Sequence, residues 1–106
     1  MEAMTVGEAA GRSGWSARML RYLERTGLVV PRRSASGYRL YGLRELNQLR
    51  SLAELRRRFR VEIADVAFAA RLRREPALRA AVETWFAGKD DPLEWEQRKH
   101  ERLLAA

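Results

Sequence analysis

Cysteine is absent from this chain of 106 residues, and histidine occurs only once. Without thiols there can be no disulfide, no thiolate metal site and no cysteine-based redox sensing. The lone histidine, His100, is expected on the surface of the last predicted helix, and the chain contains no glycine-rich phosphate loop. We therefore predict that the protein is not an enzyme, binds no metal and needs no cofactor.

Long apolar segments are missing as well. No run of about 18 apolar residues is present to span a bilayer. Residues 1–4 have neither the basic region nor the apolar region of a secretory signal. A length of 106 residues suits one small domain with an appendage. We expect a cytoplasmic, nucleoid-associated protein with no membrane partner.

Positive charge, by contrast, is abundant and unevenly placed. The net charge is +7, and 19 of the 21 basic residues are arginine. Residues 1–75 contain 16 arginines and 8 acidic residues, a net charge of +8, whereas residues 76–106 contain 5 basic and 6 acidic residues, a net charge of −1. Arginine binds phosphate and guanine through paired hydrogen bonds, which favours a nucleic-acid partner for the first part of the chain.

Two short helices are predicted at the start of the chain. Thr5 and Glu8 have the spacing of a capping box, which opens a helix that ends by Gly14. A second helix is capped by Ser16 and ends at Gly27, with leucines on its buried side and arginines on its other faces. Two short helices joined by a glycine-containing turn indicate a helix-turn-helix.

A β-hairpin is predicted next. Residues 28–31 form a short β-like run, residues 32–37 are rich in turn formers, and residues 38–41 alternate as a strand does. Because neighbouring side chains of a strand point to opposite faces, Arg39 and at least one of the flanking tyrosines can face outward.

The rest of the chain has helical periodicity. A leucine stripe predicts a helix over residues 43–59, and a further helix is predicted from Val61 to about Arg74. Proline start signals predict two more, over residues 76–87 with Gly88 as the stop, and over residues 93–105. The pattern predicts a mainly α fold.

The order of these motifs from about Met4 to Phe68 resembles the MerR family of bacterial transcription regulators. Residues 5–10 look like the family's opening helix, residues 16–24 like its recognition helix, residues 27–31 like the entry to its wing, and residues 36–41 like the return strand of that wing. The resemblance implies a winged helix-turn-helix with a small β-hairpin wing in residues 1–75 and a short helical tail in residues 76–106.

The resemblance also implies a function and partners. A protein of this kind binds double-stranded promoter DNA as a homodimer and regulates transcription, with RNA polymerase as a further possible partner. The family's long dimerising helix and effector domain are reduced here to 31 residues. We therefore expect a short member that has no effector domain and no small-molecule effector.

The residues expected to contact DNA lie in three groups. They are Ser16, Arg18, Arg21 and Tyr22 of the recognition helix; Arg32, Arg33, Tyr38, Arg39 and Tyr41 of the wing; and Arg58 and Arg60 after it. One of the two wing tyrosines is expected to pack beneath the wing, and which one stays open. Either Arg58 or Arg60 is favoured as a backbone contact.

The tail is expected to form a dimer or partner interface, because it carries an unusual amount of aromatic surface for its length. The residues concerned are Trp85, Phe86, Leu93, Trp95, Leu103 and Leu104. Two alternatives to a homodimeric regulator stay open. One is a DNA-architectural protein that binds direct repeats head to tail, and the other is an interaction adaptor whose helix-turn-helix does not bind DNA.

Overall fold

The computed structural model describes residues 3–90. By its internal contacts the chain divides into two compact units, residues 1–68 and residues 69–106, which are described separately. This division falls inside a helix. The boundary predicted from the sequence lies later, after residue 75. The helix predicted over residues 93–105 lies outside the described residues.

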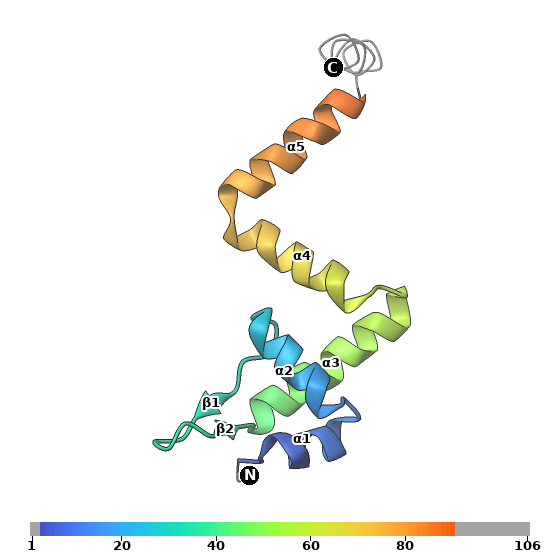
Figure 1. The fold of residues 1–106 in the computed structure, drawn as a ribbon. Coiled ribbons are helices and arrows are strands. Elements are labelled where there is room, and N and C mark those ends of the chain that lie inside the picture. The colour runs from blue at the N-terminus through green and yellow to red at the C-terminus, as the bar shows by residue number, and fades with distance from the viewer. Residues whose placement is uncertain (1–2, 91–106) are drawn as a thin grey trace. The chain divides into compact units, whose positions relative to one another are not determined.

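Helices predominate, joined by one short hairpin (Figure 1). The elements are α1 (Val6–Ser13), α2 (Ala17–Arg25), β1 (Arg32–Arg33), β2 (Arg39–Leu40), α3 (Leu43–Phe59), α4 (Ile63–Arg74) and α5 (Pro76–Asp90). The two strands pair antiparallel. The predicted fold class, a mainly helical winged helix-turn-helix with a small β-hairpin, is confirmed.

The ends of α1 and α2 form as their sequences predict. The Glu8 amide donates to the Thr5 hydroxyl at 3.2 Å, and the Thr5 amide donates to the Glu8 carboxylate at 3.2 Å. The Ser16 hydroxyl accepts from the Met19 amide at 3.1 Å. Gly14 adopts φ 81°, the left-handed conformation that lets the chain turn directly from α1 into α2.

The core of the first unit is built from α1, α2, α3, the hairpin and the start of α4. Its buried residues are Met4, Ala9, Trp15, Leu20, Leu23, Val29, Tyr41, Leu46, Leu49 and Ile63. Only the middle of the predicted leucine stripe is in this core, because Leu43, Leu55 and Phe59 are 53%, 38% and 59% exposed.

Trp15 joins the helix-turn-helix to the long helix α3. Its ring is buried, and its indole N–H donates to the Leu49 carbonyl at 2.9 Å. A buried indole requires such an acceptor, because an unpaired polar group in the core is costly. The turn between α1 and α2 is therefore fixed to a residue 34 positions later in the chain.

The hairpin is shifted from its predicted position. Residues 28–31 were expected to be the first strand, but β1 is Arg32–Arg33, inside the expected turn. The amides of Leu28 and Val29 donate instead to the Leu23 carbonyl, at 2.9 and 3.2 Å, and Val29 is buried. The apolar run thus continues the end of α2 into the core.

The turn of the hairpin is correspondingly tight. Arg32 pairs with Leu40 and Arg33 with Arg39. The Ser34 amide donates to the Tyr38 carbonyl at 2.8 Å, and Gly37 adopts φ 87°, which a glycine tolerates without strain.

Two helix boundaries after the hairpin depart from expectation or from ordinary geometry. Gly88 was predicted to end α5, but the helix continues through it to Asp90. A glycine lowers helix stability by about 1 kcal/mol without ending the helix unless it turns left-handed.

Arg60, after α3, is left-handed with φ 54° and ψ 40°, a conformation that costs an arginine about 1 kcal/mol.

Tyr41 anchors the hairpin to the N-terminal segment. Its backbone exchanges two hydrogen bonds with Met4, at 2.7 and 2.8 Å, and its side chain is fully buried. The hydroxyl has no hydrogen-bond partner among the described residues. Burial, followed by the charge of Glu24, raises the pKa of this hydroxyl.

We predict that Tyr41→Phe keeps or raises the free energy of unfolding, by up to about 1 kcal/mol, because it removes a buried unpaired hydroxyl. Tyr41→Ala should lower it by about 3 to 5 kcal/mol, since it also leaves a cavity. Urea denaturation of both variants tests this. A loss of more than about 1 kcal/mol in Tyr41→Phe would show that the hydroxyl has a stabilising partner.

The same tyrosine predicts an alkaline loss of stability. Because its pKa is raised in the folded state, the unfolded chain releases this proton first as the pH rises. The contribution of the un-ionised Tyr41 hydroxyl to the free energy of unfolding is therefore fully present below about pH 10, the ordinary tyrosine pKa. It declines above that pH. Tyr41→Phe should lack that part of the decline, which denaturation at several alkaline pH values would show.

Candidate nucleic-acid interface

The exposed side of α2 carries the residues expected to read DNA. Ser16, Arg18 and Arg21 are exposed and Tyr22 is half-buried. Arg18 and Arg21 are one turn apart and therefore neighbours on the helix surface. The opposite side of α2 is in the core through two buried leucines. The exposed arginines therefore lie on a helix that is held in place by its packing against the core.

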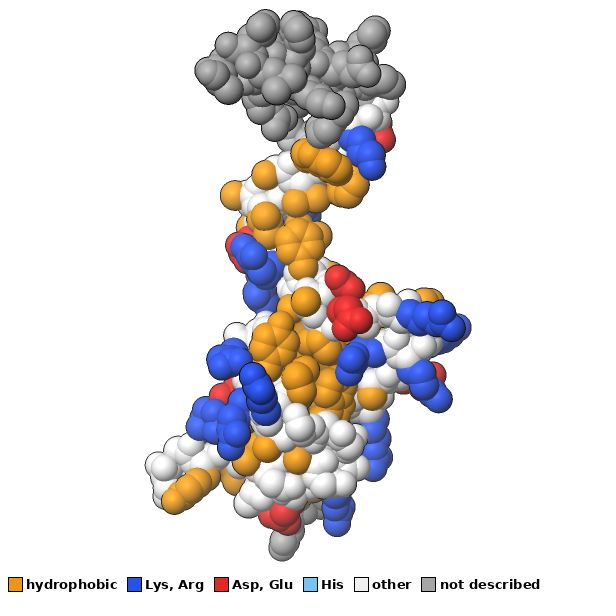
Figure 2. All heavy atoms as spheres, turned by 45° about the vertical axis from the view of Figure 1, so that its right-hand side comes forward, with side chains coloured by type: hydrophobic (Ala, Val, Ile, Leu, Met, Phe, Trp, Pro, Cys, Tyr) orange, Lys and Arg blue, Asp and Glu red, His pale blue; other side chains and the backbone are white. Residues whose placement is uncertain are grey.

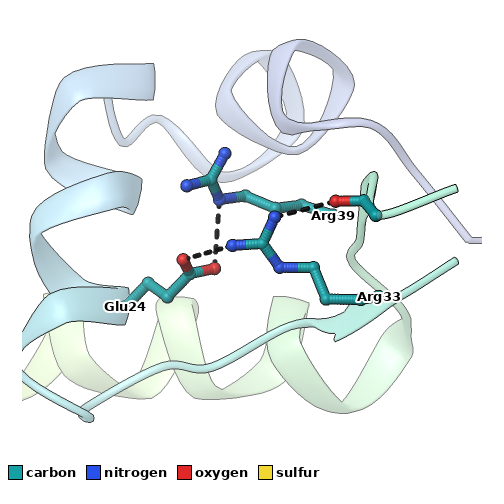
Figure 3. Close-up of polar contacts among 4 residues, drawn as sticks. Glu24, Arg33 and Arg39 are labelled. Atoms are coloured by element: carbon teal, nitrogen blue, oxygen red, sulfur yellow. Dashed lines mark hydrogen bonds and ion pairs between the residues drawn. The ribbon is translucent and has the colours of Figure 1, made fainter.

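One carboxylate connects α2 to the hairpin (Figure 3). Glu24 extends from α2 toward the two strands and accepts from Arg33 Nη2 at 2.8 Å and from Arg39 Nε at 3.0 Å. Arg33 also donates through Nη1 to the Gly37 carbonyl at 2.8 Å. We call these three side chains the wing clamp. They hold β1, β2 and the turn against the helix that carries Arg18.

Arg39 is less exposed than the outward-facing residue that strand alternation predicts. Its side chain is 29% exposed, and its Nε–H is engaged by Glu24. Its two Nη groups have no hydrogen-bond acceptor among residues 3–90. Arg33 is more accessible, at 48%, and Arg32 is exposed.

The two wing tyrosines are in opposite environments. Tyr38 is 73% exposed, and its amide donates to the Ser34 hydroxyl at 3.1 Å. Tyr41 has no exposed surface. Of the two tyrosines between which the sequence left the choice open, Tyr41 is the one that packs beneath the wing, because its side chain fills the core there and offers no surface to DNA. Tyr38 is the tyrosine left to meet a ligand.

A basic segment closes α3. Arg58 and Arg60 are exposed, and the Arg58 guanidinium lies 5.1 Å from the centroid of the Phe59 ring. Arg57 forms an ion pair with Glu54. Figure 2 shows basic side chains distributed over the surface of the helix-turn-helix unit. The positive charge is thus spread over several elements.

The second unit presents aromatic side chains on α5. Trp85 and Phe86 are 47% and 48% exposed, and their rings make an edge-to-face contact at 5.2 Å. The Lys89 ammonium lies 5.5 Å from the Trp85 ring centroid. The other residues predicted for this interface lie outside the described residues: Leu93, Trp95, Leu103 and Leu104.

Two residues important to this interface were not predicted from the sequence. Glu24 has a role in the wing clamp, and Trp15 supports the turn before α2. The available signal for Glu24 was a single acidic residue in an arginine-rich helix, followed by hairpin arginines. The signal for Trp15 was a large aromatic residue in a turn, where exposure would be unfavourable.

Metal and membrane sites are not found in the part of the chain that is described. Within residues 3–90, no three histidine, aspartate or glutamate side chains gather to hold a metal ion. Across the same residues, no helix is both long and apolar enough to cross a membrane.

We predict that Glu24→Gln loosens the wing while leaving the helices folded. The amide keeps the shape of the side chain but removes its charge, so both arginine contacts weaken, at a total cost of about 1 kcal/mol in this partly exposed site. Amide hydrogen exchange should become faster at Ser34 and Gly37. The amides of α1 should be unchanged.

Glu54→Gln is the matched control, because it makes the same chemical change in an exposed ion pair on α3. It should leave exchange at the wing unaltered. Equal wing exchange in Glu24→Gln and the unaltered protein would contradict the role given to the clamp.

The part of the chain that holds this candidate interface is similar to known proteins. Residues 5–41 match the family model described as "MerR family regulatory protein". The "HTH-type transcriptional regulator HmrR" of Rhizobium leguminosarum bv. viciae is 42% identical over 53 residues, which are 50% of this chain and 41% of that protein. The chain thus spans about two-fifths of the length of this curated relative.

Solved structures share the fold. The "HTH-type transcriptional regulator SkgA" from Caulobacter crescentus superposes with a TM-score of 0.54 at 24% identity, over 100% of this chain and 99% of that one. A second structure, described as "HiNmlR, a MerR family regulator lacking the sensor domain, bound to promoter DNA", gives a TM-score of 0.56 at 21% identity, over 97% and 82%.

These proteins are described as transcription regulators and not as enzymes. The match of residues 5–41 covers α1 and also α2, β1 and β2, the three elements that the wing clamp joins. Residues 5–41 are therefore similar to the MerR family of regulatory proteins, and the chain has the winged helix-turn-helix fold of the solved structures.

Proposed function

We propose that this protein is a sequence-specific transcription regulator that binds promoter DNA as a homodimer. In this proposal α2 enters the major groove, and the hairpin contacts the backbone or the adjacent minor groove. The protein acts on chromosomal DNA in the cytoplasm, with RNA polymerase as a further partner. One observation supports this most: Glu24 holds the wing to α2, so the exposed arginines of both elements are presented together.

The charge distribution supports the same function. Residues 1–75 carry a net charge of +8, and all of their basic residues are arginine. The recognition surface would combine Arg18 and Arg21, which can reach base edges, with Tyr22, Arg32 and Tyr38 for the backbone. Because this charge is spread over α2 and the hairpin, binding should neutralise several phosphates and depend steeply on salt.

The known relatives add support of a different kind. One structural neighbour is described as a regulator without its sensor domain, bound to promoter DNA, and this chain covers 82% of it. HmrR is described as a transcriptional regulator. Since that likeness covers only 41% of HmrR, DNA binding is the only part of a regulator's function that we carry over.

The proposed dimer depends on the tail. Trp85 and Phe86 expose about half of their surface as an adjacent pair, and aromatic residues are enriched at protein interfaces. A homodimer with twofold symmetry would place two recognition helices on the two halves of a pseudo-palindromic site.

Arg18→Ala tests DNA reading. It should lower affinity for the operator by about 1 to 3 kcal/mol, or about 5- to 150-fold, because a base-edge contact is lost. The operator would be found by footprinting DNA upstream of the protein's own and neighbouring genes, and affinity measured by fluorescence anisotropy. Arg50→Ala, an exposed arginine on α3, is the control and should change affinity little.

An adaptor that does not bind DNA would give a different result. It would bind random and operator duplexes equally weakly, and Arg18→Ala would change neither. That outcome would exclude the proposed function.

The double substitution Trp85→Ser and Phe86→Ser tests the tail interface. We expect it to convert dimers to monomers in multi-angle light scattering of the full chain, since the apolar contact area is removed. Arg79→Ser on the same helix should leave the dimer intact. A monomeric unaltered protein that binds direct repeats would favour the head-to-tail alternative instead.

A further inference from the structure

The segment that forms α2 and the hairpin carries one negative charge among many positive ones. Residues 9–44 contain eight arginines and a single acidic residue, Glu24. A carboxylate on a surface that meets phosphates repels them and reduces the positive charge that drives counterion release. Glu24 is therefore unfavourable for DNA affinity alone, which points to a different role for its charge.

Both oxygens of the Glu24 carboxylate are engaged by the hairpin. Oε1 accepts from Arg33 Nη2 at 2.8 Å, and Oε2 accepts from Arg39 Nε at 3.0 Å. The Glu24 side chain is only 17% exposed, so these contacts are screened less than those of a fully exposed pair. Glu24 follows the buried Leu23 on a helix packed against the core. The two arginines are thus held at one place relative to α2.

The two arginines keep different capacities to bind a further group. Arg33 uses both of its terminal nitrogens, one on Glu24 and one on the Gly37 carbonyl. Arg39 uses only Nε, and its two Nη groups, which have no acceptor among residues 3–90, point away from the carboxylate in Figure 3. Arg33 therefore mainly holds the turn, whereas Arg39 can still donate to a phosphate in a direction that Glu24 sets.

A phosphate contact made by a fixed arginine depends on where the duplex lies. Phosphate contacts position a protein on DNA, and contacts to base edges in the groove supply sequence specificity. An arginine on a loose wing can follow the nearest phosphate, so it adds affinity for any sequence. An arginine fixed relative to α2 meets a phosphate only in one register, and in that register α2 also reaches its bases. Fixing the arginine therefore favours the operator over random DNA.

We propose that Glu24 is a positioning residue that determines specificity, because it lowers affinity for random DNA more than affinity for the operator. Its charge neutralises part of the wing, which weakens binding to every duplex. Its hold on Arg39 compensates for this loss at the operator alone. Proteins commonly gain specificity from a repulsive or competing group as well as from attractive contacts. The inference rests on the proposed DNA-binding function and deepens it.

Glu24→Gln tests this in the full chain, with operator and random duplexes of equal length measured by fluorescence anisotropy over a range of salt concentrations. Affinity for the random duplex should rise, and its slope of log K against log salt should become steeper by up to about 0.9, because one arginine charge is no longer neutralised. The ratio of operator affinity to random affinity should fall about 5-fold, since Arg39 loses its fixed position. An unchanged ratio, or a random-duplex affinity that does not rise, would overturn the proposal.

Glu75→Gln is the matched control for charge. It makes the same change in an ion pair with Arg71 of α4, which involves neither α2 nor the hairpin. An arginine released there can alter affinity for both duplexes, but by the same factor, so the ratio should equal that of the unaltered protein. A fall in the ratio as large as that of Glu24→Gln would show a general effect of charge and would overturn the proposal.

A double substitution shows whether Glu24 acts through Arg39. Arg39→Gln alone should lower the ratio, and adding Glu24→Gln should lower it no further, because the fixed phosphate contact is already absent. A second fall of about 5-fold in the double variant would contradict this route.

The same measurements separate the two proposals. An unaltered protein that binds operator and random duplex equally would overturn the proposed function, and the specificity role of Glu24 with it. An unaltered protein that prefers the operator, with the same preference in Glu24→Gln, would overturn the role of Glu24 and leave the proposed function standing.

Discussion

The arrangement of the proposed DNA-facing surface depends on one carboxylate shared by two arginines. Glu24 is on α2, and its partners Arg33 and Arg39 are on the two strands of the hairpin, so a single side chain sets the position of the wing. The strands are two residues long and supply little pairing of their own. The ion pairs therefore supply orientation that the short sheet cannot.

Two buried contacts give this clamp a rigid base. Tyr41 joins the end of the hairpin to the segment before α1 through paired backbone hydrogen bonds with Met4. Trp15 joins the turn before α2 to α3 through the Leu49 carbonyl. Each contact connects segments more than 30 residues apart in sequence. The small core thus fixes both sides of α2, and the exposed arginines can be presented without a large domain beneath them.

Local features of this fold could be predicted from the sequence, and contacts between distant residues could not. The caps at Thr5 and Ser16 depend on neighbouring atoms, and they form as predicted. The first strand was misplaced because the Leu23 carbonyl accepts from residues 28 and 29, a competition that strand periodicity does not show. Likewise, strand alternation predicted that the two wing tyrosines point to opposite faces of the hairpin. Only the packing against Met4 shows that Tyr41 is the buried one. The clamp joins Glu24 to residues 9 and 15 positions away and has no sequence signature.

Contacts between distant residues also affect how much each arginine can contribute to DNA binding. An arginine paired with a carboxylate has its charge neutralised locally, so it adds less to counterion release than an unpaired one. Arg33, Arg39, Arg57 and Arg71 have such partners, whereas Arg18, Arg21 and Arg60 have none among residues 3–90. Glu24 in particular cancels about one of the two charges it holds. The salt dependence of binding should therefore follow the few unpaired arginines on the proposed DNA-facing side, and not the 16 arginines of residues 1–75.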